Sequence, residues 1–263
     1  MTLRLLLGAL AAALIAYAAR RARSLSPSGA LAAIVVGTAA AAAGWNWASL
    51  LILYFASSTA LSRLGRAEKE RRTAAIVEKG GERDAAQVLA NGFVFALAAI
   101  GMVVDGRQRW VAIGAGALAA SAADTWATEI GTLYGGKPRS ILTGRVMATG
   151  TSGGISLAGT AASVAGALFI AVVTDVGARL TQQALVFWPV LVAGVAGSLV
   201  DSLIGATLQS RRWCETCQRE TERHVHDCGT PTIRRRGLAL LDNDVVNFVS
   251  TVVGGLLAAS LVR

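Results

Sequence analysis

Eight apolar segments separated by hydrophilic loops are the feature that most constrains the fold of this chain. A helix needs about 20 mostly apolar residues to cross a bilayer. The chain is 54% hydrophobic and only 16% charged, whereas a soluble domain carries about a quarter charged residues. The sequence therefore predicts an all-α, polytopic transmembrane helix bundle of about eight spans, forming a single domain over residues 1–263. The segments cover residues 3–19, 29–43, 45–61, 88–104, 110–130, 153–173, 185–209 and 238–260.

The first three segments leave alternatives open. The second is short and is followed directly by the third at Gly44-Trp45-Asn46-Trp47, so the two could form a re-entrant pair instead of two full spans. The first segment resembles a signal peptide, but its arginines at positions 20, 21 and 23 follow the apolar run, whereas a signal peptide carries its charge in front. We expect an uncleaved span with an outside N-terminus.

The basic residues predict the orientation. Of the 25 Lys and Arg residues, 20 lie in loops 20–28, 62–87, 131–152 and 210–237. Because cytoplasmic loops carry an excess of Lys and Arg, these four loops are predicted to be cytoplasmic, which requires eight crossings. The net charge of +9 follows from these loops, so we expect no nucleic-acid partner. The predicted location is the cell membrane.

Three carboxylates lie inside the predicted spans. Asp124 and Glu129 are near the cytoplasmic end of the fifth segment, and Asp201 is near that of the seventh. A charge at the bilayer centre costs about 2.5–3.5 kcal/mol, so such groups usually face the bundle interior and serve an ion or substrate. The alternative is a carboxylate that caps a helix or pairs with a loop Arg. We favour a polar active site that also includes other polar residues near membrane boundaries, namely Asn91, Asp244 and Asn247.

Asp124 and Asp201 have similar surroundings. Asp124 lies in ADTWATEIG (123–131) and Asp201 lies in GSLVDSLIGATLQ (197–209). A hydroxyl residue follows each of them, and each lies about two-thirds along its apolar segment. Magnesium prefers oxygen ligands of this kind, so the pair predicts a magnesium site.

A basic, glycine-rich loop follows the Asp124 segment. It reads GGKPRSILTGRVMATGTSGG, residues 135–154, and a helix is predicted to start after it. Glycines permit close backbone approach and a helix N-terminus presents free N–H groups, so the loop could hold a phosphate. It is not a Walker A loop, and the alternative is an ordinary flexible loop with Thr and Ser caps. Its candidate ligands are Lys137, Arg139, Arg145, Thr151, Ser152 and Gly153.

The inserted loop 210–237 contains all three cysteines and both histidines of the chain. Three thiolates and one imidazole complete a closed tetrahedral zinc site. The alternatives are a redox-active Cys-x-x-Cys pair or unrelated surface residues. We favour a structural zinc ion that staples this cytoplasmic loop through Cys214, Cys217, His226 and Cys228.

The last apolar segment begins with a polar cluster, LLDNDVVNF at residues 240–248. Asp242 suits a helix N-cap. Asn243 and Asn247 are four residues apart and share a helix face, and Asp244 and Asn247 can also meet. The cluster has more polar groups than one cap needs.

Taken together, these motifs resemble the integral-membrane family of domain-of-unknown-function 92, which includes the plant phytyl-phosphate kinase of chlorophyll-phytol salvage. The resemblance covers about residues 28–260. More distantly, the stretch from Asp124 to GTSGG is similar to polyprenol kinases that use CTP, although Thr149 stands where those kinases have Glu. The DNDVVN motif is loosely similar to phosphatidate cytidylyltransferases. The motifs that carry the resemblance are QVLANG (87–92), ADTWATEIG, GTSGG (150–154), GSLVDSLIGATLQ, the Cys/His group and DNDVVN (242–247).

The resemblance implies a magnesium-dependent kinase that transfers a phosphoryl group from CTP or another nucleoside triphosphate, such as ATP. The acceptor would be an isoprenyl monophosphate, such as phytyl or geranylgeranyl phosphate, or the isoprenoid alcohol. Phosphoryl transfer needs charge neutralisation and positioning more than covalent help. On this view Asp124, Asp201 and Asp244 hold magnesium. Lys137, Arg139 and Arg145 hold phosphates, and Glu129 orients a metal ligand or the attacking oxygen. The nucleotide or the lipid phosphate is bound by Asn91, Gln209, Asn243 and Asn247.

Two alternatives remain. A cytidylyltransferase that makes a CDP-activated lipid would release pyrophosphate, whereas the kinase would release a nucleoside diphosphate. A transporter for an ion or a lipid phosphate would place its acidic groups at the bilayer midplane, with gates on both sides. The polar groups of this sequence gather on one side, which favours an enzyme.

Overall fold

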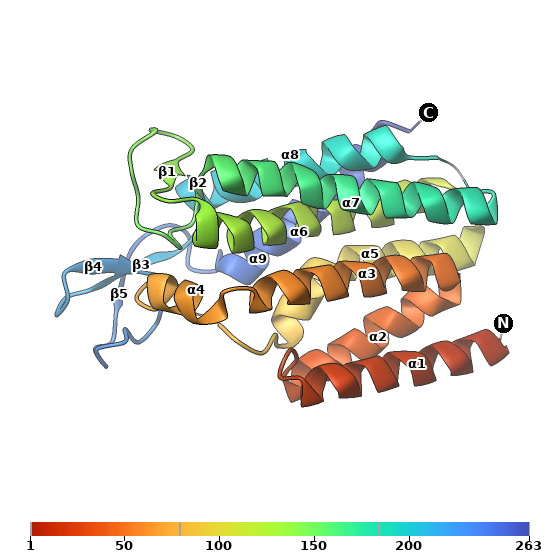
Figure 1. Cartoon of the computed structure of the whole chain (residues 1–263), viewed down its shortest axis with the longest axis horizontal. Helices are drawn as coiled ribbons and strands as arrows, with labels where there is room; N and C mark the ends of the chain where they lie inside the picture. The colour runs from red at the N-terminus through yellow and green to blue at the C-terminus, as the bar shows by residue number, and fades with distance from the viewer. Residues whose placement is uncertain (1, 79, 184, 263) are drawn as a thin grey trace.

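The chain is mostly helical in a computed structural model, which describes residues 2–78, 80–183 and 185–262 (Figure 1). Within these residues the helices are α1 (Thr2–Arg21), α2 (Pro27–Ala43), α3 (Trp45–Arg63), α4 (Arg66–Thr73), α5 (Ala85–Asp105), α6 (Arg109–Tyr134), α7 (Leu157–Thr181), α8 (Phe187–Thr207) and α9 (Asn243–Ser260).

Short strands occupy the loops. β1 (Arg139–Ser140) pairs antiparallel with β2 (Gly154–Ile155). β3 (Arg211–Cys214), β4 (Arg219–Thr221) and β5 (Ile233–Arg236) form an antiparallel sheet in the order β4–β3–β5. This sheet fills the loop between α8 and α9.

Each predicted apolar segment overlaps one helix, and α7 and α9 begin four and five residues after the predicted starts. α7 runs on to Thr181, beyond the predicted end at residue 173, and α4 was not predicted at all. Among the described residues, α1, α5, α7 and α8 are long and apolar enough to cross a membrane, and α3 with α4 adds a fifth if this pair, bent by 72°, is one span. α2 is a shorter apolar helix. The structure therefore supports a multi-pass helical protein, and eight crossings remain a prediction.

α6 lies at the centre of the bundle and contacts α3, α5, α7, α8 and α9. Its first half is a run of buried Ala and Gly residues. A Cβ on Gly116 would lie 2.6 Å from the Gly254 carbonyl of α9, and one on Gly194 of α8 would lie 2.8 Å from Ala119. Small side chains thus let the backbones of α6, α8 and α9 approach closely.

The two ends of the bundle differ. The loops that carry most basic residues, together with α4 and all the strands, lie at one end, on the left of Figure 1, which we call the polar end. α2, α5, α7 and α9 begin there. In each of them the side chain of the N-cap residue accepts a hydrogen bond from a backbone N–H of the first turn. The N-cap residues are Ser26, Asp84, Ser156 and Asp242. Such caps satisfy the free N–H groups of a first helical turn.

Candidate functional site

A cavity of about 1010 Å³ opens at the polar end of the bundle. Its walls come from α3 to α9, from the GTSGG turn (residues 150–154) and from the β3–β5 sheet. Most of the sequence-predicted site residues line it, namely Asn91, Asp124, Glu129, Thr151, Ser152, Gly153, Asp201, Gln209, Asn243, Asp244 and Asn247.

Asp124 and Asp201 face the same cavity from the neighbouring helices α6 and α8. The Oδ2 atom of Asp201 is buried and has no hydrogen-bond partner among the described residues. The negative charges of Asp124 and Glu222 both act on Asp201. Like charges and a buried, unpartnered carboxylate oxygen are unfavourable unless a cation compensates them. These oxygen donors therefore suit a hard divalent cation such as magnesium.

The start of α9 closes one side of the cavity. Asp242 is the N-cap, as predicted, and its carboxylate accepts the Val245 N–H at 2.9 Å. Asp244 is buried two residues further on, and Asn243 and Asn247 also line the cavity. Capping thus accounts for Asp242 and leaves Asp244 and the two asparagines on the cavity wall.

Glu129 forms an ion pair with Lys69 of α4. Ser62 Oγ donates to Glu129 Oε1 at 2.6 Å, and Lys69 Nζ also donates to the Leu61 carbonyl at 2.7 Å. Arg83 donates to Ser62 Oγ at 3.1 Å. Glu129 therefore fits the alternative interpretation of the buried carboxylates, in which a carboxylate pairs with a basic residue of a predicted loop. The pair holds α4 against α6.

Asn91 is fixed by a chain of hydrogen bonds in the bundle. The Tyr54 hydroxyl and Ser121 Oγ are 2.6 Å apart, and Ser121 Oγ donates to Asn91 Oδ1 at 2.6 Å. The Asn91 amide nitrogen donates to the Gln87 carbonyl at 2.9 Å. These bonds set the orientation of the amide at the cavity wall.

The GTSGG turn docks on the end of α8. Gly153 has φ +79°, and a Cβ there would lie 2.5 Å from the Ala206 Cβ. Ser152 Oγ donates to Glu222, while Arg211 donates to the Ser152 carbonyl at 2.5 Å. Burial raises the pKa of Glu222, against the lowering effect of the Ser152 hydrogen bond and of the Arg211 charge. The absence of a side chain at Gly153 thus lets the GTSGG turn approach α8 closely.

Lys137, Arg139 and Arg145 do not line the cavity, although the sequence analysis assigned phosphates to them. All three are exposed: Lys137 precedes β1, Arg139 starts β1 and donates to the Gly144 carbonyl at 2.9 Å, and Arg145 lies on the loop between β1 and β2. The β1–β2 loop projects outward after Ser140 and returns to the cavity wall at Thr149, so these basic residues stay outside the cavity.

Other basic residues line the cavity, and the sequence analysis did not single them out for it. They come from loops 62–87 and 210–237, which the sequence predicts to be cytoplasmic. That shared location is the one feature of the sequence that could have pointed to them. They are Arg63, Arg66, Lys69, Arg83, Arg212 and Arg234, and Arg23 joins them from the first loop.

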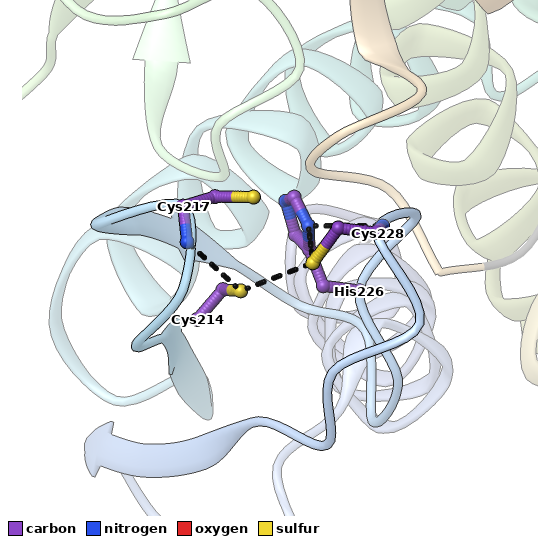
Figure 2. Close-up of side chains that lie close together, drawn as sticks. All are labelled: Cys214, Cys217, His226 and Cys228. Atoms are coloured by element: carbon purple, nitrogen blue, oxygen red, sulfur yellow. Dashed lines mark hydrogen bonds between the residues drawn. The ribbon is translucent and has the colours of Figure 1, made fainter.

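The Cys/His group of loop 210–237 also comes together. Figure 2 shows Cys214, Cys217, His226 and Cys228 pointing toward one another. Their candidate ligand atoms all lie within 4.8 Å of one another. The group lies in the β3–β5 sheet, beside the cavity and outside its lining.

Comparison with known proteins assigns the family. Residues 10–255 match the model of the integral membrane protein family DUF92. This chain belongs to that family. It is 31% identical to Protein PGR of Arabidopsis thaliana, over 97% of this chain and 95% of that protein. It is 29% identical to an uncharacterized membrane protein of Methanocaldococcus jannaschii, over 97% and 93%.

The chloroplastic Protein VTE6 of Arabidopsis thaliana is 27% identical, over 89% of this chain and 64% of that protein. No solved structure matches. The family and these relatives make the chain an integral membrane protein that is similar to plant and archaeal proteins over most of its length.

Proposed function

We propose that this protein is a membrane kinase that transfers a phosphoryl group from CTP, or another nucleoside triphosphate, to an isoprenyl monophosphate or to the isoprenoid alcohol. The observation that carries this proposal is the cavity at the polar end. Asp124, Asp201 and Asp244 line it together with basic residues such as Lys69, Arg83 and Arg212. Carboxylates for a metal ion and cations for phosphates are the parts that phosphoryl transfer requires.

In this proposal Asp124, Asp201 and Asp244 hold magnesium, which neutralises the charge of the nucleotide phosphates. The cavity-lining Lys and Arg side chains bind phosphate oxygens. Asn91, Gln209, Asn243 and Asn247 offer amide groups to the nucleotide or to the lipid phosphate. Glu129 acts through Lys69, because its carboxylate is already engaged by that ammonium group.

The acceptor would enter from the lipid. The cavity lies at the end of apolar helices, so an isoprenoid tail can lie along the bundle while its polar head reaches the carboxylates. If the acceptor is a monophosphate, both reactants are anionic, and the surplus of basic side chains around the cavity favours their joint binding. We propose eight crossings of the cell membrane, with the polar end in the cytoplasm because the Lys and Arg residues gather there.

The test is an assay of purified protein with magnesium, labelled CTP or ATP, and phytyl or geranylgeranyl monophosphate. The expected products are an isoprenyl diphosphate and a nucleoside diphosphate. Pyrophosphate with a CDP-activated lipid would instead establish the cytidylyltransferase. Absence of nucleotide binding in folded, magnesium-loaded protein would contradict both enzymes and support the transporter.

The matched control is a carboxylate at the opposite end of the bundle. Asp105 is at the end of α5, where its carboxylate accepts the indole N–H of Trp110 at 2.7 Å. Asp105→Asn should leave turnover unchanged, whereas Asp201→Asn should lower it by roughly 100- to 1000-fold. Equal activity in the two variants would contradict a role for the cavity carboxylates.

A further inference from the structure

The segment between α8 and α9, residues 211–237, which we call the inserted module, has no hydrophobic core. The structure describes all of these residues, and the buried ones are Arg211, Cys214, Thr221, His226 and Thr232. No aliphatic or aromatic side chain of the module is buried. Strands of three or four residues cannot hold together by themselves, and small units without a core need a staple.

The buried centre of the module is the Cys/His group. Cys214 Sγ lies 3.6 Å from Cys228 Sγ, and Cys228 Sγ lies 3.2 Å from His226 Nδ1. Ligands on a tetrahedron around zinc, with bonds of about 2.0–2.3 Å, are separated by roughly 3.3–3.8 Å. The thiols are free cysteines, and His226 is almost fully buried. All four candidate ligand atoms lie within 4.8 Å of one another, and Asp227 Oδ1 also lies 2.6 Å from His226 Nδ1. The group is thus gathered closely enough for one metal ion to bridge it (Figure 2).

We propose that Cys214, Cys217, His226 and Cys228 bind one zinc ion, which replaces the missing hydrophobic core and fixes the position of the GTSGG turn at the cavity. Four protein ligands leave no open coordination position, so this zinc is structural. Binding converts the thiols to thiolates and releases their protons to solvent.

The module reaches the cavity through both ends of its metal-bound hairpin. Cys214 ends β3, and Arg211, which starts the same strand, donates to the carbonyls of Ser152 and Gly205. Glu222, directly after β4, accepts a hydrogen bond from Ser152 Oγ. The side chains of Arg211 and Glu222 both hydrogen-bond the GTSGG turn. They can hold the turn only while β3 and β4 remain folded in their present positions.

The same hairpin also holds the chain that follows α4. The Glu222 N–H donates to the Ile76 carbonyl at 2.9 Å, and Arg223 donates to the Ala74 carbonyl at 2.8 Å. His224 Nδ1 lies 2.5 Å from Glu78 Oε1. Because Glu78 and the GTSGG turn both line the cavity, a metal-ordered hairpin positions two of its walls. The zinc ligands are positioning residues, since none of them lines the cavity.

The first experiment is elemental analysis of the purified, full-length protein, which should contain one zinc ion per chain. Cobalt exchanged into the wild-type protein should give the intense visible absorption of a tetrahedral thiolate site. Cys217→Ser should lower zinc affinity by about tenfold or more. The matched control is His224→Asn, which changes the other histidine of the module and should keep its zinc. Wild-type protein without zinc, or equal zinc affinity of Cys217→Ser and wild type in competition with a chelator, would overturn the site.

The second experiment tests the coupling to the cavity and needs no catalytic turnover, so its failure is distinct from failure of the kinase proposal. Zinc is stripped from wild-type protein with a thiol-directed mercurial and a chelator, and amide hydrogen exchange is followed. Exchange in residues 150–154 and 74–78 should rise by about tenfold on stripping and return with zinc, while exchange in α5 to α6 stays unchanged. Faster exchange confined to residues 211–237 would refute the positioning role.

Discussion

The two ends of the helix bundle are built from the same helices but by different rules. At the polar end, α2, α5, α7 and α9 begin with side-chain caps, and the connections contain strands, ion pairs and a cavity. At the opposite end, α3, α6 and α8 follow short connections, and they begin without a side-chain capping bond. The opposite end only joins helices, whereas the polar end orders long loops.

The largest difference between the ends should appear in turnover. Asp201→Asn should lower kcat by roughly 100- to 1000-fold, the usual cost of removing one group that stabilises transition-state charge. Its melting temperature should not fall, because the amide removes repulsion from Asp124 and Glu222. Kinetics and thermal unfolding of Asp201→Asn and Asp105→Asn in parallel would check this. A large loss of stability without a kinetic effect would contradict it.

The Lys69–Glu129 pair should contribute more stability than any ion pair at the opposite end. The pair is largely buried, with side-chain exposures of 10% and 21%. Lys69→Met leaves Glu129 without its cation and should cost about 2–3 kcal/mol, somewhat below a fully buried pair. Adding Glu129→Gln to this variant should recover part of the loss. Thermal unfolding of the two single variants and the double variant measures the coupling, and additive effects would contradict it.

Comparing two glycines separates the stability cost of disturbing the docked GTSGG turn from the cost of backbone strain. Gly153 and Gly144 both have positive φ, +79° and +68°, but only Gly153 faces backbone, that of Ala206. Gly144→Ala should cost about 1 kcal/mol from strain alone. Gly153→Ala should cost about 1–3 kcal/mol more, as overpacking does, and should raise the KM for nucleotide. Equal melting temperatures in the two variants would argue against close docking.

The smallest effect is expected for the exposed basic residues of the β1–β2 loop. A variant with Ala at Lys137, Arg139 and Arg145 should change the KM for nucleotide less than about fivefold, because an exposed charge contributes about 0–1 kcal/mol. Arg83→Gln, which changes a cavity-lining residue, should raise the KM by more than about tenfold. Steady-state kinetics of the two variants measure these changes in KM. A larger increase in the triple variant than in Arg83→Gln would instead assign phosphate binding to the β1–β2 loop.

The long helices could be predicted because each of them corresponds to an apolar run in the sequence. α4 could not be predicted in this way, because its eight residues are highly polar. It is held by long-range contacts, in which Lys69 pairs with Glu129 and Arg72 donates to the carbonyls of Thr132 and Leu133 at the end of α6. Contacts of this kind join residues about 60 positions apart, and neither composition nor periodicity reveals them.

The candidate site shows a similar division. Asp124 and Asp201 stood out because a carboxylate within an apolar span needs a reason, and they do line a common cavity. The cationic partners were chosen for closeness to Asp124 in sequence, and the β1–β2 pairing keeps those residues outside the cavity. Lys69 comes to the site on α4, Arg83 on the loop before α5 and Glu222 with the sheet, so only the tertiary structure identifies them.

The residues that line the cavity are spread along almost the whole chain, which affects how the protein is synthesised and inserted into the membrane. Its lining begins in the first loop and ends at Asn247, so the ribosome must synthesise almost the entire protein before the cavity can exist. The inserted module and Asp244 are made last, after six of the helices that line the cavity or support it. A chain that stalls during membrane insertion would therefore hold apolar helices but no closed site.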